Sequence, residues 1–171
     1  MHIEPVLYKN ATAEQKAILE ENFEVYPFGI VTIKLERIFV DKIFAAEFYY
    51  RKLNDPTLED RKRKNAAFDA AKHVYDLMIL FEIPKIKALL SDNKFLKQII
   101  EFKREEELAR AGGIEPSLKI NNFSYLNKSL EDQEFLKAYE KMQEIYVFND
   151  KDKLPLTKVG NVFRAIKAIT E

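Results

Sequence analysis

Hydrophobic and polar residues follow one pattern before Leu35 and a different one after it. Residues 2–8 and 28–34 are short segments that alternate or are rich in β-branched side chains, which is typical of strands. Pro5 favours an edge position for the first strand, because proline has no backbone N–H to donate. A two-stranded sheet is marginal alone, so we expect these strands to pack on helices or to pair with further strands.

From Leu35 onward, apolar residues recur every three to four positions, which predicts amphipathic helices. Capping residues are predicted at Thr12 with Gln15, at Ser91 or Asp92, at Ser129 with Asp132, and at Thr157. Gly112 and Gly113 are predicted to end a helix. The helices are expected at residues 12–22, 35–53, 66–81, 84–90, 92–109, 130–147 and 157–169. The sequence therefore predicts a mainly α fold with a small β component.

The amino-acid composition excludes some classes of function and disfavours others. The 171 residues include no cysteine, which excludes disulfides, thiolate zinc sites and a cysteine nucleophile. Lysine and arginine together number 28, as do aspartate and glutamate, so the net charge is zero. This balance disfavours a globally basic nucleic-acid binder but is compatible with a local basic patch. No apolar run is long enough to span a membrane, so we expect a cytoplasmic protein without a membrane partner.

Lys42 interrupts the apolar face of the predicted helix 35–53, four residues after Ile38 and four before Ala46. Lysine is seldom buried without a partner. Its ammonium group either extends from the edge of the apolar face into solvent or points into a cleft, where it would hold a phosphate or a carboxylate. The sequence leaves both interpretations open.

Asp69, Lys72, His73 and Asp76 lie on one face of the predicted helix 66–81. The simpler interpretation is a solvent-exposed face with the pairs Asp69–His73 and Lys72–Asp76. However, the face becomes apolar one turn after Asp76. This change favours partial burial of the Asp76 carboxylate and, with it, a functional role.

Two further charged segments are weaker candidates for a functional site. The four consecutive cations Arg61–Lys64 fall in a predicted loop, and such a run is usually solvated, although it also suits the steering of a polyanion. Asp150-Lys151-Asp152 resembles a D-x-D metal pair only in its letters. Its position after a helix favours a turn.

Residues 36–42 (ERIFVDK) and 72–77 (KHVYDL) resemble two motifs, E-R-T-F-x-E-K and R-H-x-x-D-L, of the AbiEii/AbiGii nucleotidyltransferase toxins. These toxins form a family of type IV toxin–antitoxin and phage abortive-infection systems. The chain departs from the motifs at Ile38, Asp41 and Lys72. The order of the motifs and the charged segment between them also match.

The resemblance implies a fold in two parts. Residues 1–85 would be the C-terminal part of a polymerase-β-like nucleotidyltransferase core, with a small remnant of its sheet. Residues 86–171 would form a helical bundle domain, which resembles the family in architecture only.

The resemblance also implies roles for individual residues. Lys42 would contact the triphosphate of the incoming nucleotide, with Lys72 and Arg37 as further nucleotide contacts. Asp76 would orient or deprotonate the acceptor, and His73 would position Asp76. The implied substrates are a nucleoside triphosphate and an RNA, notably the end of a tRNA, and operon logic implies a cognate antitoxin as partner.

The family's first motif, a Gly-rich turn followed by R-x-S-x-D-x-D with two metal-binding aspartates, is absent from this sequence. The resemblance implies Mg²⁺, but Glu4 is the one remaining candidate ligand. We therefore expect an N-terminally truncated form that binds nucleotide or RNA and is not catalytically complete alone. Two alternatives remain: a non-enzymatic helical module that docks on a partner through aromatic-rich faces, and one half of a split nucleotidyltransferase.

Overall fold

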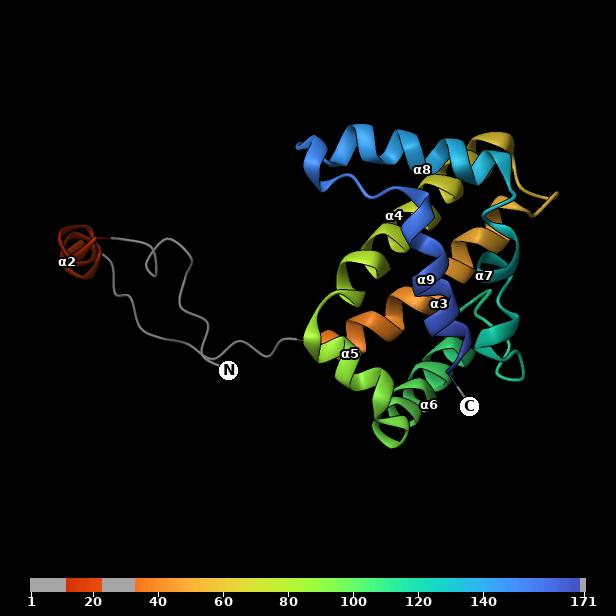
Figure 1. Ribbon diagram of the computed structural model, residues 1–171, viewed down its shortest axis with the longest axis horizontal. Helices are drawn as coiled ribbons and strands as arrows, with labels where there is room; N and C mark the ends of the chain where they lie inside the picture. Colours follow the sequence, from red (N-terminus) through yellow and green to blue (C-terminus); the bar gives the residue numbers. More distant parts are fainter. Residues whose placement is uncertain (1–11, 23–32, 170–171) are drawn as a thin grey trace. The chain divides into compact units, whose positions relative to one another are not determined.

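The protein is described by a computed structural model that places residues 12–22 and 33–169. The chain divides into two compact units, residues 1–33 and residues 34–171 (Figure 1). Within the described residues every regular element is a helix, which confirms the prediction of a mainly helical protein.

The first unit contains α2 (Ala13–Asn22). The predicted capping box is confirmed, because the Thr12 N–H donates to Gln15 Oε1 at 2.9 Å and the Gln15 N–H donates to Thr12 Oγ1 at 3.2 Å. The strand predicted at residues 2–8 and most of the strand predicted at 28–34 lie outside the described residues. The remnant of a polymerase-β-like sheet therefore stays a prediction.

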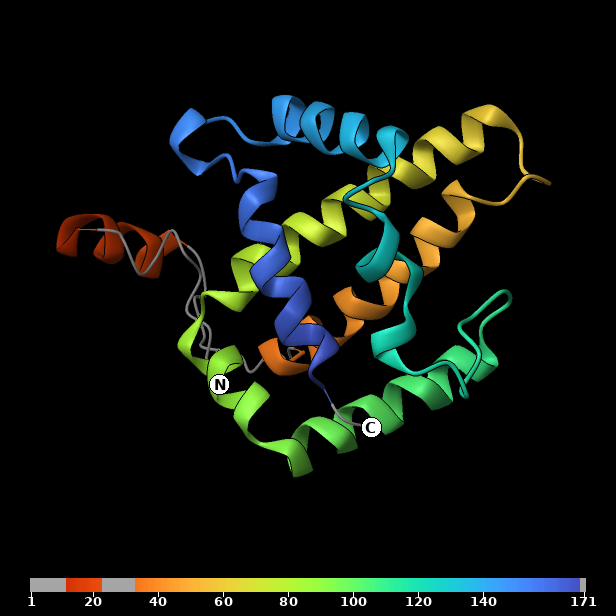
Figure 2. The same ribbon diagram turned by 45° about the vertical axis from the view of Figure 1, so that its right-hand side comes forward.

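The second unit is a bundle arranged around a central pair of helices. Its elements between residues 34 and 169 are α3 (Leu35–Leu53), α4 (Asp60–Phe81), α5 (Pro84–Ser91), α6 (Asn93–Ala109), η1 (Ile120–Asn122), α7 (Ser124–Lys128), α8 (Gln133–Tyr146), η2 (Asp150–Asp152) and α9 (Leu156–Lys167). Helix α3 contacts α4, α5, α6 and α7, while α4 also contacts α5, α8 and α9. Figure 2 shows α8 lying across α4 at one end of this pair and α6 lying beside α3 at the other.

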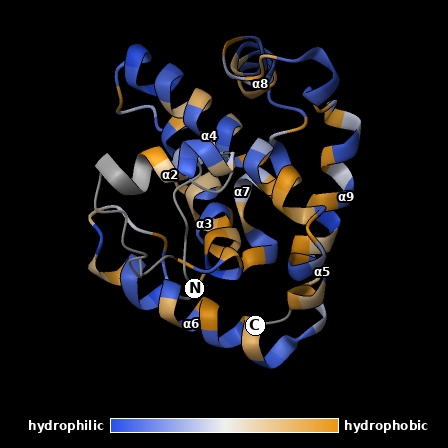
Figure 3. Ribbon diagram, turned by 90° about the vertical axis from the view of Figure 1, so that its left-hand side faces the viewer, coloured by the Kyte–Doolittle hydropathy of each residue, from blue (hydrophilic) through white to orange (hydrophobic). Residues whose placement is uncertain are grey.

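Helix α4 carries four buried alanines. The side chains of Ala66, Ala67, Ala70 and Ala71 are spaced as one helix face, and all four residues are buried. Small side chains let helix backbones approach closely. The buried apolar residues of α3 are mostly large: Phe39, Val40, Ile43, Phe44, Phe48 and Tyr50. Figure 3 shows hydrophobic and hydrophilic residues interleaved along the helices, as amphipathic packing requires.

The predicted start of the second long helix is wrong. Helix α4 begins at Asp60, six residues before the predicted start, so Arg61–Lys64 is helical and not a loop. The Asp60 carboxylate interacts favourably with the N-terminal end of the helix dipole. It also pairs with Arg63 at 3.4 Å and with Lys64 at 2.7 Å, which offsets repulsion within the cationic run. The other predicted helix ends lie within three residues of the observed ones.

Helix α8 begins at Gln133 because Asp132 is its N-cap. The Asp132 carboxylate accepts two backbone N–H hydrogen bonds in the first turn, at 3.0 and 3.2 Å. The phenol of Tyr50 on α3 also donates to this carboxylate, at 2.9 Å. Ser129, which the sequence pairs with Asp132 in a cap, instead donates its hydroxyl to the carbonyl of Tyr125 at 2.6 Å.

The two glycines after α6 form the turn that the sequence predicts. Gly112 has a φ of +72°, a left-handed conformation that favours glycine. At Gly113, a Cβ atom would lie 2.0 Å from the carbonyl oxygen of Glu107, so the close approach of the chain to α6 excludes any side chain.

Residues 34–171 form one compact unit in which α4 contacts both α8 and α9. The predicted boundary between residues 1–85 and 86–171 falls inside this unit. Residues on both sides of this boundary belong to one unit because helices from both sides cover α4 and share one hydrophobic core.

Asp132→Ala should lower the free energy of unfolding by about 2 kcal/mol, because it removes the cap of α8 and leaves the buried Tyr50 hydroxyl without its acceptor. Urea unfolding followed by circular dichroism measures the change. Glu131→Ala, at the neighbouring exposed residue, is the control and should stay within about 0.5 kcal/mol of the parent chain. Equal losses in the two variants would contradict the capping role.

Candidate functional site

Helices α3 and α4 bring three of the predicted site residues into one cluster. Lys42 Nζ on α3 donates to Asp76 Oδ2 on α4 at 2.6 Å. The same ammonium nitrogen lies 3.4 Å from His73 Nδ1. Lys42, His73 and Asp76 are named together below as the α3–α4 cluster. The structure thus brings Lys42 and Asp76 into contact, and their chemical roles stay predictions.

Within the α3–α4 cluster, His73 is nearer to Lys42 than to Asp76. Its Nδ1 atom is 3.9 Å from Asp76 Oδ2, beyond hydrogen-bond distance. Its ring stacks on Tyr49, with centroids 5.4 Å apart and planes at 29°. His73 is therefore placed to orient the lysine, whereas the family resemblance implies that it positions the aspartate.

The imidazole of His73 is neutral at neutral pH. Burial lowers its pKa, and the nearby charges of Lys42 and Lys72 lower it further, to about 4. A neutral imidazole that accepts a hydrogen bond from Lys42 at Nδ1 carries its proton on Nε2. The α3–α4 cluster thus contains one cation, one anion and one neutral acceptor.

The α3–α4 cluster is half-buried, because the side chain of Lys42 is 26% exposed and that of Asp76 is 34% exposed. An ion pair at such a surface adds little to stability. The Lys42 ammonium is also accessible to an anionic ligand, provided that the ligand competes with Asp76. The structure therefore gives Lys42 a carboxylate partner from the neighbouring helix, Asp76, whose identity the pattern around Lys42 does not specify.

The remaining pairs on this face of α4 differ from the expected ones. Lys72 Nζ pairs with Asp69 Oδ1 at 3.2 Å, three residues before it, while Asp76 pairs with Lys42 from the other helix. The Lys72 side chain is 41% exposed, so it remains accessible to a ligand at the edge of the α3–α4 cluster.

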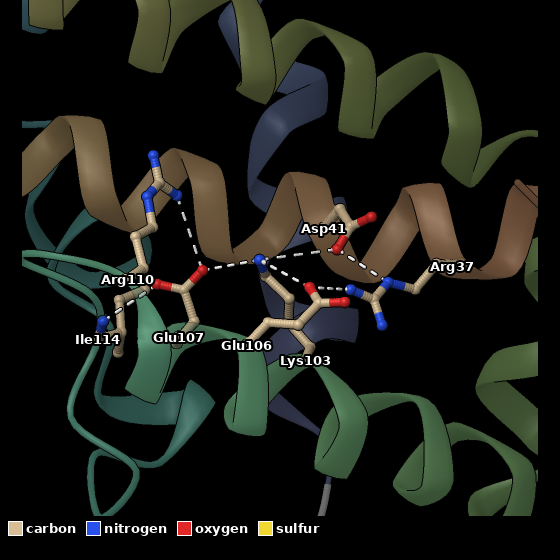
Figure 4. Close-up of polar contacts among 7 residues, drawn as sticks. All are labelled: Arg37, Asp41, Lys103, Glu106, Glu107, Arg110 and Ile114. Carbon is tan, nitrogen blue, oxygen red and sulfur yellow. Dashed lines mark hydrogen bonds and ion pairs between the residues drawn. The ribbon is translucent and has the colours of Figure 1, made fainter.

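Arg37 belongs to a separate network on the side of α3 that faces α6 (Figure 4). Its guanidinium donates to Asp41 at 3.0 Å and also pairs with Glu106. The network contains Arg37, Asp41, Lys103, Glu106, Glu107, Arg110 and the backbone of Ile114. The structure thus places Arg37 away from the α3–α4 cluster, and both groups that it pairs with are carboxylates.

Glu107 anchors this second network. Its buried carboxylate lies 2.7 Å from Lys103 Nζ and accepts the Ile114 N–H at 3.1 Å. Burial pushes the pKa of Glu107 up, but the hydrogen bonds from Lys103 and the Ile114 backbone lower it by more, so the carboxylate stays ionised. Arg37 is therefore part of a structural ion network between α3 and α6.

The α3–α4 cluster does not fit the Mg²⁺ ion that the resemblance implies. Asp76 is its one carboxylate, and the Lys42 ammonium at 2.6 Å repels a second cation. Among the residues that the structure describes, no group of three histidine, aspartate or glutamate side chains is arranged to hold a metal ion. Glu4, the predicted ligand, lies outside those residues.

Glu47 is a buried carboxylate whose role the sequence analysis misses. It is fully buried on α3, and its Oε2 atom accepts the backbone N–H of Tyr125 on α7 at 3.1 Å. Burial raises the pKa of Glu47. The one signal in the sequence is an acidic residue inside the apolar stretch 43–50, which shows that a partner is needed but not which one.

Comparison of the chain with protein-family models, curated proteins and solved structures gives no match. None of the helices in the described part of the chain combines the length and the apolar character that crossing a membrane requires.

The free energy of unfolding should fall by about 2.5 kcal/mol between pH 6.5 and pH 4 because of His73. The pKa of His73 is about 4 in the folded protein and near its ordinary value in the unfolded chain, so the unfolded state binds the proton first as the pH falls. His73→Gln should remove this part of the pH dependence in urea unfolding curves.

An NMR titration of the imidazole provides the direct check, with the His73→Gln spectrum used for assignment. A His73 signal that titrates near pH 4 supports the buried, lysine-contacting imidazole. Titration near pH 6.5 would contradict it.

Proposed function

We propose that this chain is a nucleotidyltransferase-like toxin of the AbiEii/AbiGii type, in which residues 34–171 bind a nucleoside triphosphate and an RNA acceptor. One observation carries the proposal: the two segments that resemble the family's motifs meet in space. Lys42 from the first segment and Asp76 from the second are 2.6 Å apart, although 34 positions separate them along the chain.

The geometry of the α3–α4 cluster suggests an exchange of partners. In the chain without nucleotide, Asp76 neutralises Lys42. A triphosphate carries more negative charge than one carboxylate and competes for the ammonium group. Once displaced, the Asp76 carboxylate is able to accept a hydrogen bond from the hydroxyl group of an RNA acceptor.

His73 and Lys72 assist this exchange in different ways. His73 accepts a hydrogen bond from Lys42 and adds no positive charge of its own, so it orients the lysine in both states. Lys72, at the exposed edge of the α3–α4 cluster, supplies a second cation for the phosphates. Arg37 is paired with two carboxylates in the α3–α6 network and does not take part in this step.

The chain alone is expected to bind nucleotide without transferring it. The sequence lacks the family's R-x-S-x-D-x-D motif, and the α3–α4 cluster does not fit Mg²⁺. The carboxylates that would hold the metal would therefore have to come from elsewhere, as in the split-enzyme alternative. Incubation with labelled nucleoside triphosphates, Mg²⁺ and total tRNA tests this, and labelled RNA would overturn it.

Lys42→Met should weaken triphosphate binding about tenfold, the loss expected for one charge-assisted hydrogen bond. Asp76→Asn should strengthen binding, because it removes the competing carboxylate. Titration with a fluorescent nucleoside triphosphate at low salt measures both effects. Lys85→Met is the matched control, since Lys85 is also a lysine of an inter-helix ion pair, 3.2 Å from Glu36 on α3.

Lys42→Met and Asp76→Asn are expected to change nucleotide affinity in opposite directions. This difference distinguishes a binding site from a structural ion pair. If the Lys42–Asp76 pair only stabilises the fold, both variants lose stability and neither changes nucleotide affinity. Equal losses of affinity in Lys42→Met and Lys85→Met would show that binding depends on overall charge alone.

The second candidate function is a non-enzymatic interaction module, such as one that binds a cognate antitoxin. Ile145, Tyr146 and Phe148, at the end of α8, favour it because they are 51%, 57% and 99% exposed. Exposed apolar groups of this kind are frequent at protein interfaces. The nucleotide titration distinguishes the two functions, since a pure interaction module binds no triphosphate at the α3–α4 cluster.

A further inference from the structure

A groove runs between the N-terminal half of α4 and the adjacent face of α8. Figure 2 shows α8 lying across α4, and the two helices are in direct contact. The groove is open to solvent and has a volume of about 390 Å³. Its lining consists of Lys64, Asn65, Ala67, Phe68, Glu134, Lys137, Ala138 and Lys141. This set of residues is called the α4–α8 groove below.

The charge of the α4–α8 groove favours an anionic ligand. Three of its lining residues, Lys64, Lys137 and Lys141, are lysines, and one, Glu134, is acidic. Lys64 is already paired with Asp60 at 2.7 Å, so Lys137 and Lys141 on α8 are the cations offered to a ligand. Lys137 and Lys141 are one helical turn apart on α8, so their ammonium groups project from the same face. Glu134 lies 4.0 Å from Lys137, and both side chains are exposed, so this ion pair is weak.

The shape of the groove favours a flat apolar group beside the anion. Ala67 and Ala138 have short side chains, one on each helix, and leave room between the lysines. The ring of Phe68 lines the groove, and its centroid lies 5.6 Å from that of Tyr146, which is 57% exposed. Lysines combined with accessible aromatic rings are typical of surfaces that bind single-stranded nucleic acid, because phosphates pair with the cations and bases stack on the rings.

Helix geometry connects the α4–α8 groove with the α3–α4 cluster. Lys64, Phe68, Lys72 and Asp76 are spaced four residues apart, which places them along one ridge of α4. The ridge is about 18 Å long, at 1.5 Å per residue. It begins at the groove, passes the exposed Lys72 and ends at the carboxylate proposed to contact the acceptor.

We infer that the α4–α8 groove binds a single-stranded RNA segment, with phosphates on Lys137 and Lys141 and a base against Phe68. This inference uses the proposed function for the identity of the ligand as RNA, whereas the groove itself rests on its own lining residues. The ridge of α4 then directs the end of the bound strand toward Asp76.

The test is fluorescence anisotropy with a 5′-labelled oligoadenylate of twelve nucleotides, measured from 50 to 200 mM salt without nucleoside triphosphate. The double variant Lys137→Gln/Lys141→Gln should bind at least tenfold more weakly at low salt. It should also reduce the slope of log affinity against log salt by about 1.4, or 0.7 for each lost phosphate contact to a single strand.

Lys94→Gln/Lys97→Gln is the matched control. These two lysines are also exposed and lie about one turn apart, but on α6, which lies at the opposite end of the central helix pair (Figure 2). This control should bind within twofold of the parent chain. Equal losses in both double variants would overturn the proposal, because they would show binding through diffuse charge.

Phe68→Leu tests the contact with the base while keeping an apolar side chain. It should weaken oligoadenylate binding severalfold and leave competition by inorganic polyphosphate unchanged, with thermal unfolding confirming that the variant is folded. Unchanged oligoadenylate binding would overturn the assignment of a base to Phe68. A double-stranded probe that binds as tightly as the single strand would overturn the preference for single strands.

The variant Lys42→Met tests RNA binding at the α4–α8 groove independently of triphosphate binding at the α3–α4 cluster. It should leave oligoadenylate binding within twofold of the parent chain while it weakens triphosphate binding. Loss of RNA binding in the Lys137/Lys141 variant with normal triphosphate binding therefore supports the groove. Absence of RNA binding in the parent chain, with triphosphate binding intact, overturns the groove alone.

Discussion

Close packing of α3 against α4 is the constraint on which the rest of the structure depends. Helix α3 and helix α4 contact each other along their length, and the remaining helices cover the surfaces that this pair leaves open. Four buried alanines on α4 allow its neighbours to approach closely. The α3–α4 cluster is a consequence of the same packing, because Lys42 and Asp76 belong to different helices. A larger residue at the fully buried Ala70 or Ala71 would overpack the core around α4.

Buried carboxylates fix the irregular part of the chain between α6 and α8. Glu47 on α3 accepts the N–H of Tyr125 at the start of α7, and Glu107 on α6 accepts the N–H of Ile114 in the loop that follows. The Tyr125 ring in turn packs edge-on against Phe163 of α9, with centroids 5.3 Å apart. Buried backbone N–H groups need acceptors, and here acidic side chains from two long helices provide them.

The charged side chains around α3 have two different physical roles. On the side facing α6, Arg37 and Asp41 are saturated by opposite charges and tie two helices together. On the side facing α4, Lys42 has one anionic partner, a neutral imidazole and partial access to solvent. Only the second arrangement leaves an ammonium group that a phosphate is able to reach, which is why the proposed site lies between α3 and α4.

The sequence by itself determined most of the helices and their faces, because those depend on neighbours within one or two turns, but it did not predict the short helix α7. The structure agrees with three local signals. They are the helical spacing of apolar residues after Leu35, the capping residues Thr12 and Asp92, and the turn at Gly112. The start of α4 at Asp60 escaped prediction because a run of four cations favours a loop unless nearby acids pair with it.

Only the tertiary structure decided which charges meet. Asp76 bonds to Lys42 across 34 positions and Glu47 bonds to Tyr125 across 78, and such partners depend on how helices pack and not on any local pattern.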